Sequence, residues 1–136
     1  MKKLKTLNIV KIVSIISFCL IILNGSMICM PFLLYLIISV FNVGEISQTI
    51  TSIIGICGLI LVFKEFGEKV TLKRVLKDLL AFMFLIIPLI ERLNSIPIKL
   101  FDYLTFKIPI ILFLVLYLIS TILLTKECLK VKQNPL

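Results

Sequence analysis

The sequence predicts an all-α integral membrane protein with four transmembrane helices in an up-down bundle. Three observations favour this class: a surplus of apolar residues, their grouping into long runs, and the position of basic residues between those runs. The chain has 136 residues, 60% of them hydrophobic, and a mean hydropathy of +1.20. Soluble domains are about 45–50% apolar, and a core of this size cannot bury such a surplus. We therefore expect a single transmembrane domain over residues 1–136, with its excess apolar surface facing lipid.

Four apolar runs are candidates for membrane spans. Three of them, at 46–63, 75–92 and 107–125, fit one span each, because about 20 helical residues cross about 30 Å of hydrocarbon. The first run, 12–41, is too long for one straight helix. It is either one kinked or extended span, or two short spans that turn at 24–26.

Basic residues decide between these alternatives, because cytoplasmic segments of membrane proteins are enriched in Lys and Arg. With four spans and a cytoplasmic N-terminus, the inner segments 1–11, 64–78 and 126–136 carry four, five and three of them. The outer segments 42–45 and 91–107 carry none and three. Five spans would make the two sides nearly equal. We therefore predict four spans, both termini in the cytoplasm, and an uncleaved N-terminal anchor.

The most charged stretch, 63–78, joins the second and third predicted spans. Gly67 suits the end of one helix and Thr71 the N-cap of the next, so the two spans should form an antiparallel hairpin. We assign its basic side chains to the inner surface of the membrane, facing solvent or anionic headgroups. These residues are Lys64, Lys69, Lys73, Arg74 and Lys77.

The outer segment between the third and fourth spans is more apolar than a loop requires. Ser95 can cap a helix, Pro97 is tolerated in a first turn, and several apolar residues share one face. We predict a helix over about 95–105 that lies in the outer interface. The alternative is a loop folded back onto the bundle.

Small and polar residues indicate how the helices pack. Thr51, Gly55 and Gly58 follow one another at helical spacing, and such stripes allow close approach of two helices within one molecule or in a dimer. Asn24 and Tyr117 are the polar residues predicted at greatest depth. Tyr117 continues with Thr121 and Thr125 in a thin polar stripe. We expect Asn24 and Tyr117 to form hydrogen bonds between helices; the alternative is a narrow polar path or a binding seam.

Chemistry-bearing residues are few. The chain has no histidine, and its four cysteines form no C-x-x-C pair, so we predict no metal site, no cofactor, no disulfide and no catalytic residue. We place all seven acidic residues at interfaces or in connecting segments, and no Lys or Arg in mid-span. Glu65 and Glu68 lie three residues apart, but the neighbouring Lys64 and Lys69 favour a solvated face over a cation site.

These features favour a non-enzymatic accessory, regulatory or immunity-type membrane subunit that acts through helix contacts. The alternative is a small oligomeric transporter or lipid-flipping protein. The expected partners are the lipid bilayer and either a second membrane protein or further copies of the chain. The net charge of +8 does not indicate nucleic acid, because the aromatic residues lie inside apolar runs. One alanine, no tryptophan and abundant Ile, Lys and Leu are typical of an AT-rich genome, so we expect the inner membrane of a bacterium.

Overall fold

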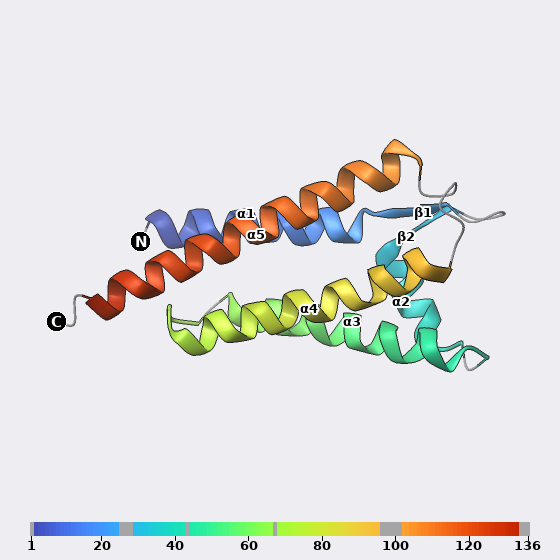
Figure 1. Cartoon of the computed structure of the whole chain (residues 1–136), viewed down its shortest axis with the longest axis horizontal. Helices are drawn as coiled ribbons and strands as arrows, with labels where there is room; N and C mark the ends of the chain where they lie inside the picture. The colour runs from blue at the N-terminus through green and yellow to red at the C-terminus, as the bar shows by residue number, and fades with distance from the viewer. Residues whose placement is uncertain (1, 25–28, 43, 67, 96–101, 134–136) are drawn as a thin grey trace.

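The computed structural model is mostly helical. It describes residues 2–24, 29–42, 44–66, 68–95 and 102–133. Five helices and one two-stranded antiparallel sheet occur within these ranges (Figure 1). In chain order they are α1 (Lys2–Cys19), β1 (Ile22–Asn24), β2 (Cys29–Pro31), α2 (Phe32–Val40), α3 (Ile46–Glu65), α4 (Leu72–Ser95) and α5 (Leu104–Gln133).

The four long helices form two pairs. Helix α1 packs along α5, and α3 packs along α4, while the short α2 packs on α3 (Figure 1). Helix α1 begins and α5 ends at one end of the molecule, where the joint between α3 and α4 also lies; we call this the terminal end. The β1–β2 hairpin and α2 lie at the opposite end, the hairpin end. The chain therefore runs up and down along one long axis.

Two helices are long and apolar enough to cross a membrane, judged by length and composition. They are α3 and the Leu104–Val131 part of α5. Only 28% of the most apolar stretch of each is buried within the molecule, whereas the core helix of a soluble protein is mostly buried. The exposed apolar side chains of these helices suggest association with a membrane.

Residues 12–41 differ from the predicted kinked or extended span. Helix α1 ends at Cys19, and β1 pairs with β2 so that Ile22 lies opposite Pro31 and Asn24 opposite Cys29. The backbone N–H of Phe32 closes this hairpin by donating to the carbonyl of Ile21 over 2.7 Å. The chain thus reverses direction between Asn24 and Cys29, close to the turn that the charge count argued against.

This reversal leaves the up-and-down order of the long helices unchanged. Helix α2 has nine residues, and at 1.5 Å per residue it is about 14 Å long, about half of a hydrocarbon core. It therefore does not carry the chain back to the terminal end, and α3 starts at the hairpin end (Figure 1). Counting basic residues could not reveal this arrangement. A segment that turns back within one half of the bundle moves no Lys or Arg to the other side of the predicted membrane, so the numbers on the two sides stay the same.

The predicted interfacial helix over 95–105 falls mostly on residues 96–101, which lie outside the described residues. At its edges, Ser95 is the last residue of α4 and Leu104 the first of α5. The Ser95 hydroxyl donates to the carbonyl of Glu91 within α4 over 2.8 Å. Ser95 therefore belongs to the preceding helix, and the rest of the predicted helix is not tested by the described residues.

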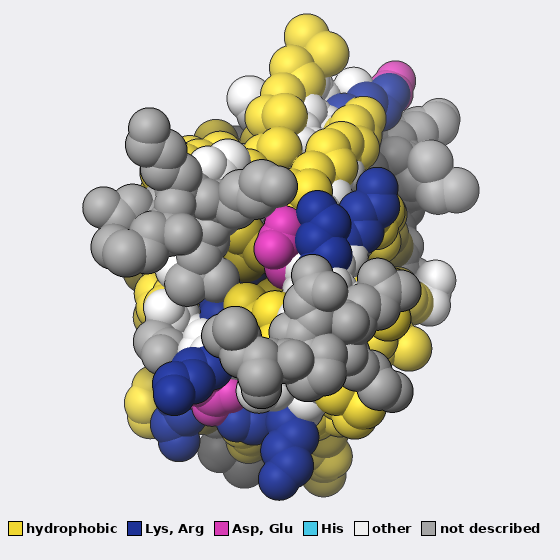
Figure 2. Space-filling model, turned by 90° about the vertical axis from the view of Figure 1, so that its left-hand side faces the viewer, with side chains coloured by type: hydrophobic (Ala, Val, Ile, Leu, Met, Phe, Trp, Pro, Cys, Tyr) yellow, Lys and Arg dark blue, Asp and Glu magenta, His cyan; other side chains and the backbone are white. Residues whose placement is uncertain are grey.

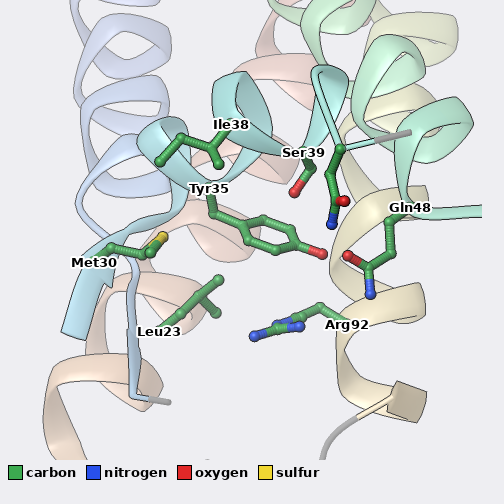
Figure 3. A pocket seen from close by; sticks show the side chains of 8 residues that line it. Leu23, Met30, Tyr35, Ile38, Ser39, Gln48 and Arg92 are labelled. Atoms are coloured by element: carbon green, nitrogen blue, oxygen red, sulfur yellow. The ribbon is translucent and has the colours of Figure 1, made fainter. Parts of the chain in front are cut away.

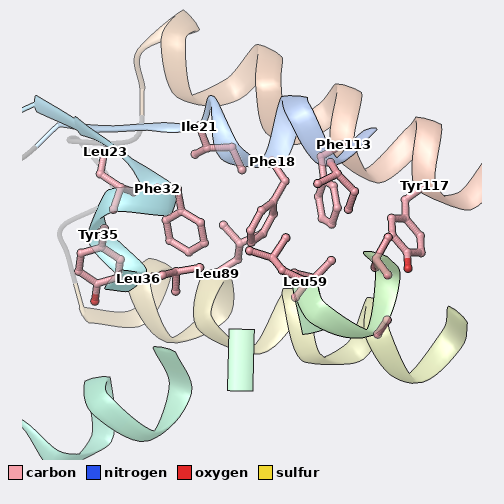
Figure 4. Close-up of a cluster of buried hydrophobic side chains, with 14 of the residues drawn as sticks. Phe18, Ile21, Leu23, Phe32, Tyr35, Leu36, Leu59, Leu89, Phe113 and Tyr117 are labelled. Carbon is pink, nitrogen blue, oxygen red and sulfur yellow. The ribbon is translucent and has the colours of Figure 1, made fainter. Parts of the chain in front are cut away.

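Aromatic rings fill the space between the two helix pairs. Phe18 of α1 lies 5.2 Å from Phe32 and 5.0 Å from Phe113, measured between ring centroids. Tyr117 continues the row, stacked on Phe82 of α4 at 4.8 Å. Each of the contacts is within the range in which aromatic pairs attract. The row links α1, α2, α4 and α5 along the axis of the molecule (Figure 4).

The predicted small residues of α3 lie against α4. A Cβ atom added to Gly55 would stand 3.0 Å from Pro88 Cγ, and one added to Gly58 would stand 2.9 Å from Phe84 Cβ. The Thr51 hydroxyl donates to Glu91 Oε2 over 3.1 Å, so this end of the stripe also faces α4. The stripe is thus occupied within the molecule by α4, where small residues let two backbones approach closely.

Replacing Gly58 with leucine tests this close approach. The new side chain would meet Phe84 and the carbonyl of Ala81, both fixed parts of α4. We expect Gly58→Leu to lower the free energy of unfolding by about 1–3 kcal/mol, measured by thermal unfolding of the purified protein in detergent. The control is Cys57→Leu, one residue earlier on an exposed position. Equal melting temperatures for the two variants would contradict the α3–α4 contact described above.

Candidate functional site

Four charged side chains are buried together near the terminal end. Lys11, Glu65, Arg74 and Asp78 are each 0–1% exposed, and we refer to them as the ionic cluster. Lys11 lies in α1, Glu65 is the last residue of α3, and Arg74 and Asp78 lie four residues apart on one face of α4. Three helices from both helix pairs therefore supply the cluster.

Lys11 is the central cation of the ionic cluster. Its ammonium nitrogen donates to Glu65 Oε2 over 2.5 Å and to Asp78 Oδ1 in a second short ion pair. The same nitrogen lies 5.5 Å from the centroid of the Tyr117 ring, within range of a cation–π attraction. One lysine thus binds α1 to the end of α3, the start of α4 and the middle of α5.

Asp78 receives further hydrogen bonds from α5. The Tyr117 hydroxyl donates to Asp78 Oδ1 over 2.9 Å, and the Thr121 hydroxyl donates to Oδ2 over 2.8 Å. Both carboxylate oxygens therefore have donors from α5, and hydrogen bonds to a charged group are stronger than those between neutral groups. Tyr117 and Thr121 are four residues apart, which places both hydroxyls on one face of α5.

Arg74 attaches the joint between α3 and α4 to α1. Its guanidinium donates to the carbonyl of Glu68 over 2.6 Å and to Asn8 Oδ1 over 3.2 Å. Asn8 in turn donates from its amide to the carbonyl of Phe66 over 3.5 Å, a long contact. These contacts hold the end of the α3–α4 hairpin against the first half of α1.

The charges of the ionic cluster cancel, since it contains two cations and two carboxylates. Burying any one of them alone would cost several kcal/mol, and pairing offsets that cost only where the geometry is close. Two atoms are less well satisfied: Glu65 Oε1 and Arg74 Nε are buried without a hydrogen-bond partner. Chemically, the cluster can lock α1 to α3 and α4, because it brings two carboxylates to one ammonium.

The basic residues assigned to the inner surface divide into two groups. Lys64, Lys69, Lys73 and Lys77 are exposed, and Lys77 forms a surface ion pair with Glu68 over 2.5 Å. Arg74 departs from the prediction, because it is fully buried and bonded to Glu68 and Asn8. Figure 2 shows Lys and Arg side chains gathered on the terminal end, with acidic side chains among them.

Two predictions about polar residues are corrected by the structure, one about a contact and one about exposure. Tyr117 does not reach Asn24: its hydroxyl bonds to Asp78, while the neighbouring Leu23 lies at the far end of the aromatic row (Figure 4). Asn24 itself lies in β1, and its side chain is outside the described part of the chain. Glu65 and Glu68 do not share a solvated face either, because Glu65 is buried against Lys11 and Glu68 pairs with Lys77.

Lys11, Glu65 and Asp78 were not among the predicted site residues. The sequence predicts all acidic residues at interfaces or in connecting segments, and it places Lys11 in the inner basic segment 1–11. One signal in the sequence could have located Lys11, because Leu7, Lys11 and Ile15 follow one another at intervals of four, and Leu7 and Ile15 are buried. A lysine on the buried stripe of a helix requires a carboxylate from another helix.

Other chemistry has little support within the described residues. They contain no group of three or more His, Cys, Asp or Glu that could hold a metal ion. Comparison of the chain with models of known protein families, with curated proteins and with solved structures gives no match. The function is therefore argued from the ionic cluster and the surface of the helices.

Lys11→Met tests whether the ionic cluster holds the helix pairs together. Methionine keeps most of the length of lysine but leaves two buried carboxylates without their shared cation. We expect the free energy of unfolding to fall by about 3–5 kcal/mol, measured by chemical unfolding in mixed micelles. Adding Asp78→Asn to Lys11→Met should recover part of this loss, because one of the two unpaired charges is then removed.

The control for this experiment is Lys73→Met, which removes an exposed lysine of the same end. We expect a change within about 0.5 kcal/mol, as is usual for surface substitutions. If Lys11→Met were no more destabilising than Lys73→Met, the cluster would not hold α1 in place.

Proposed function

We propose that this protein is a non-enzymatic membrane subunit of accessory, regulatory or immunity type, which acts on a partner through its helices. The observation that carries the proposal is the contrast between its interior and its surface. Its buried charged groups bond to one another or to polar groups of the chain, so they are used within the molecule. Its long helices present apolar side chains outward, and on α5 these include Ile111, Val115, Ile119 and Ile122, each 43–57% exposed.

The proposed placement is the inner membrane of a bacterium, with four spans and both termini in the cytoplasm. Helices α1 and α4 would supply the two crossings beyond α3 and α5. The distribution of basic residues supports this orientation. So does the position of four exposed lysines at the terminal end, where each can attract anionic headgroups by about 1 kcal/mol.

Reporter fusions test this placement. We expect an outside signal for fusions after Gly44 and Ile98, and a cytoplasmic signal after Gly67, because the positive-inside rule places the basic joint in the cytoplasm. The measurement is the paired activity of a reporter active only outside and one active only inside. An outside signal at Gly67 would refute the four-span topology.

The ionic cluster supports a structural use of the buried charges. It is charge-balanced, and its members differ from the residues that line two cavities of the molecule, of about 260 and 290 Å³. One of these cavities lies at the hairpin end, and the other runs between α1 and α5 beside Leu7 and Leu123. A substrate in either cavity would not touch Lys11 or Asp78 directly. What remains available to a partner is the apolar surface of the helices.

Site-specific photo-crosslinking tests the helix-contact function. A photoreactive residue at Ile119, which is 43% exposed, should give one discrete adduct with a second membrane protein in cells. The same residue at Leu124, which is 1% exposed on the same helix, should give none. The partner identified at Ile119 should also co-purify in a fixed ratio from mild detergent. Adducts with lipid alone at Ile119 and at further exposed positions of α3 and α5 would exclude the proposal.

A second candidate function is a small oligomeric transporter or lipid-flipping protein. The buried Lys11, Glu65 and Asp78 favour it, because ionisable groups within a membrane protein often mark a transport path. On this hypothesis the purified protein alone would move an ion or lipid across liposomes, and Asp78→Asn would abolish the movement without unfolding the protein. Self-adducts at Ile119 together with such activity would replace the accessory function by this one.

A further inference from the structure

A small pocket lies at the hairpin end, on the opposite side of the molecule from the ionic cluster. It has a volume of about 260 Å³ and is bounded by the hairpin, by α2, by the first turn of α3 and by the last turns of α4. One wall is apolar and consists of Leu23, Met30 and Ile38. The other wall is polar and contains Tyr35, Gln48 and Arg92 (Figure 3). The pocket is therefore amphipathic.

Two polar groups in the polar wall lack a partner. Tyr35 is 8% exposed, and its buried hydroxyl lies beside Ser39 and Arg92 but forms no hydrogen bond of good geometry with either. The Nε atom of Arg92 is likewise buried without an acceptor. Figure 3 shows the Tyr35 hydroxyl pointing toward Gln48, with Arg92 alongside. Buried polar groups in folded proteins are nearly always hydrogen-bonded, so unpaired donors that line a cavity indicate an acceptor that enters it.

The charge of Arg92 is not balanced by a carboxylate in the described part of the chain. Its guanidinium lies 4.6 Å from the centroid of the Tyr35 ring, a cation–π contact that holds the side chain in place. The neighbouring Glu91 faces α3 and accepts a hydrogen bond from Thr51. Arg92 thus presents a positive charge to the pocket and forms no ion pair with a described carboxylate. Planar guanidinium groups of this kind bind phosphate and carboxylate oxygens well.

We propose that this pocket binds a phosphate group that carries a short apolar substituent. A phosphate offers three strong acceptor oxygens, which suits separate donors from Arg92, Tyr35 and the amide of Gln48. The apolar substituent would lie on Leu23, Met30 and Ile38. The volume is close to the lower limit of about 300 Å³ for ligand pockets, so the site takes a headgroup and the adjoining chain, and not a large molecule.

The position of the pocket along the helices agrees with this ligand. Arg92 is three residues from the end of α4, which places it about 4.5 Å from the helix terminus. In a helix that crosses a bilayer, that depth is the level of the headgroups. Phosphate could therefore reach the site from a phospholipid of the adjoining leaflet or from solution.

Binding of defined phosphate compounds to the full-length protein in a non-ionic detergent tests the site. The probes are dihexanoyl phosphatidylglycerol, inorganic phosphate and, as a carboxylate with one chain of the same length, hexanoate. We expect phosphatidylglycerol to raise the melting temperature in a saturable manner, and hexanoate to have a much smaller effect. Equal saturation by inorganic phosphate would assign the site to free phosphate, whereas binding of phosphatidylglycerol alone would assign it to lipid. Failure of both phosphate probes to bind would overturn the proposal.

Three variants locate the bound phosphate. Arg92→Gln removes the charge and should weaken binding of phosphatidylglycerol by about tenfold or more. Tyr35→Phe removes one donor and keeps the ring, so it should weaken binding by about threefold to tenfold. The control is Lys107→Gln, which removes an exposed cation near the same end that pairs with Asp102. Unchanged affinity in both Arg92→Gln and Tyr35→Phe would overturn the assignment, and so would an equal loss in Lys107→Gln.

Discussion

The ammonium group of Lys11 joins two helix pairs that also meet through aromatic rings and through hydrogen bonds of Asp78 and Arg74. It binds Glu65 at the end of α3 and Asp78 near the start of α4, and it faces the Tyr117 ring of α5. In an apolar environment no water replaces a lost partner, so a shift of α1 along its axis would strand two carboxylates. Dispersion between apolar side chains imposes no comparable penalty on sliding. The ion pairs therefore set how far α1 reaches along the bundle, and the aromatic row follows from that register.

The register has consequences at both ends of the molecule. With α1 fixed at its lysine, Phe18 meets Phe113 and Phe32, and the chain leaves α1 at Cys19. The hairpin and α2 then lie over the last turns of α4, where Tyr35 contacts Arg92. The terminal end is thus closed by internal charge pairs, and the hairpin end is left with a small polar pocket. The apolar middle between the two ends matches the environment that the composition requires.

Periodic apolar residues predicted most of the helices, since α3, α4 and α5 cover 46–63, 75–92 and 107–125. The glycines of α3 also indicated a close helix contact, because only small side chains permit backbones to approach as Gly58 approaches Ala81. The ionic cluster was not predicted, because its members are far apart in sequence and each resembles an interfacial charge when considered alone. Lys11 and Asp78 are 67 residues apart. The hairpin at 22–31 was not predicted for a different reason. The number of Lys and Arg residues on each side of the membrane is the same with or without such a short reversal.

Two arginines of α4 show how the same residue type acquires different roles. Arg74 is fully buried, and its terminal nitrogens donate to the carbonyl of Glu68 and to Asn8. Arg92 is only partly buried, contacts the face of the Tyr35 ring and lines a cavity. An arginine whose donors are used within the fold has little attraction left for a ligand. One held beside a space of headgroup size retains most of its attraction for an anion. The use of its donors within the fold, and not its charge alone, therefore distinguishes the structural arginine from the one suited to bind.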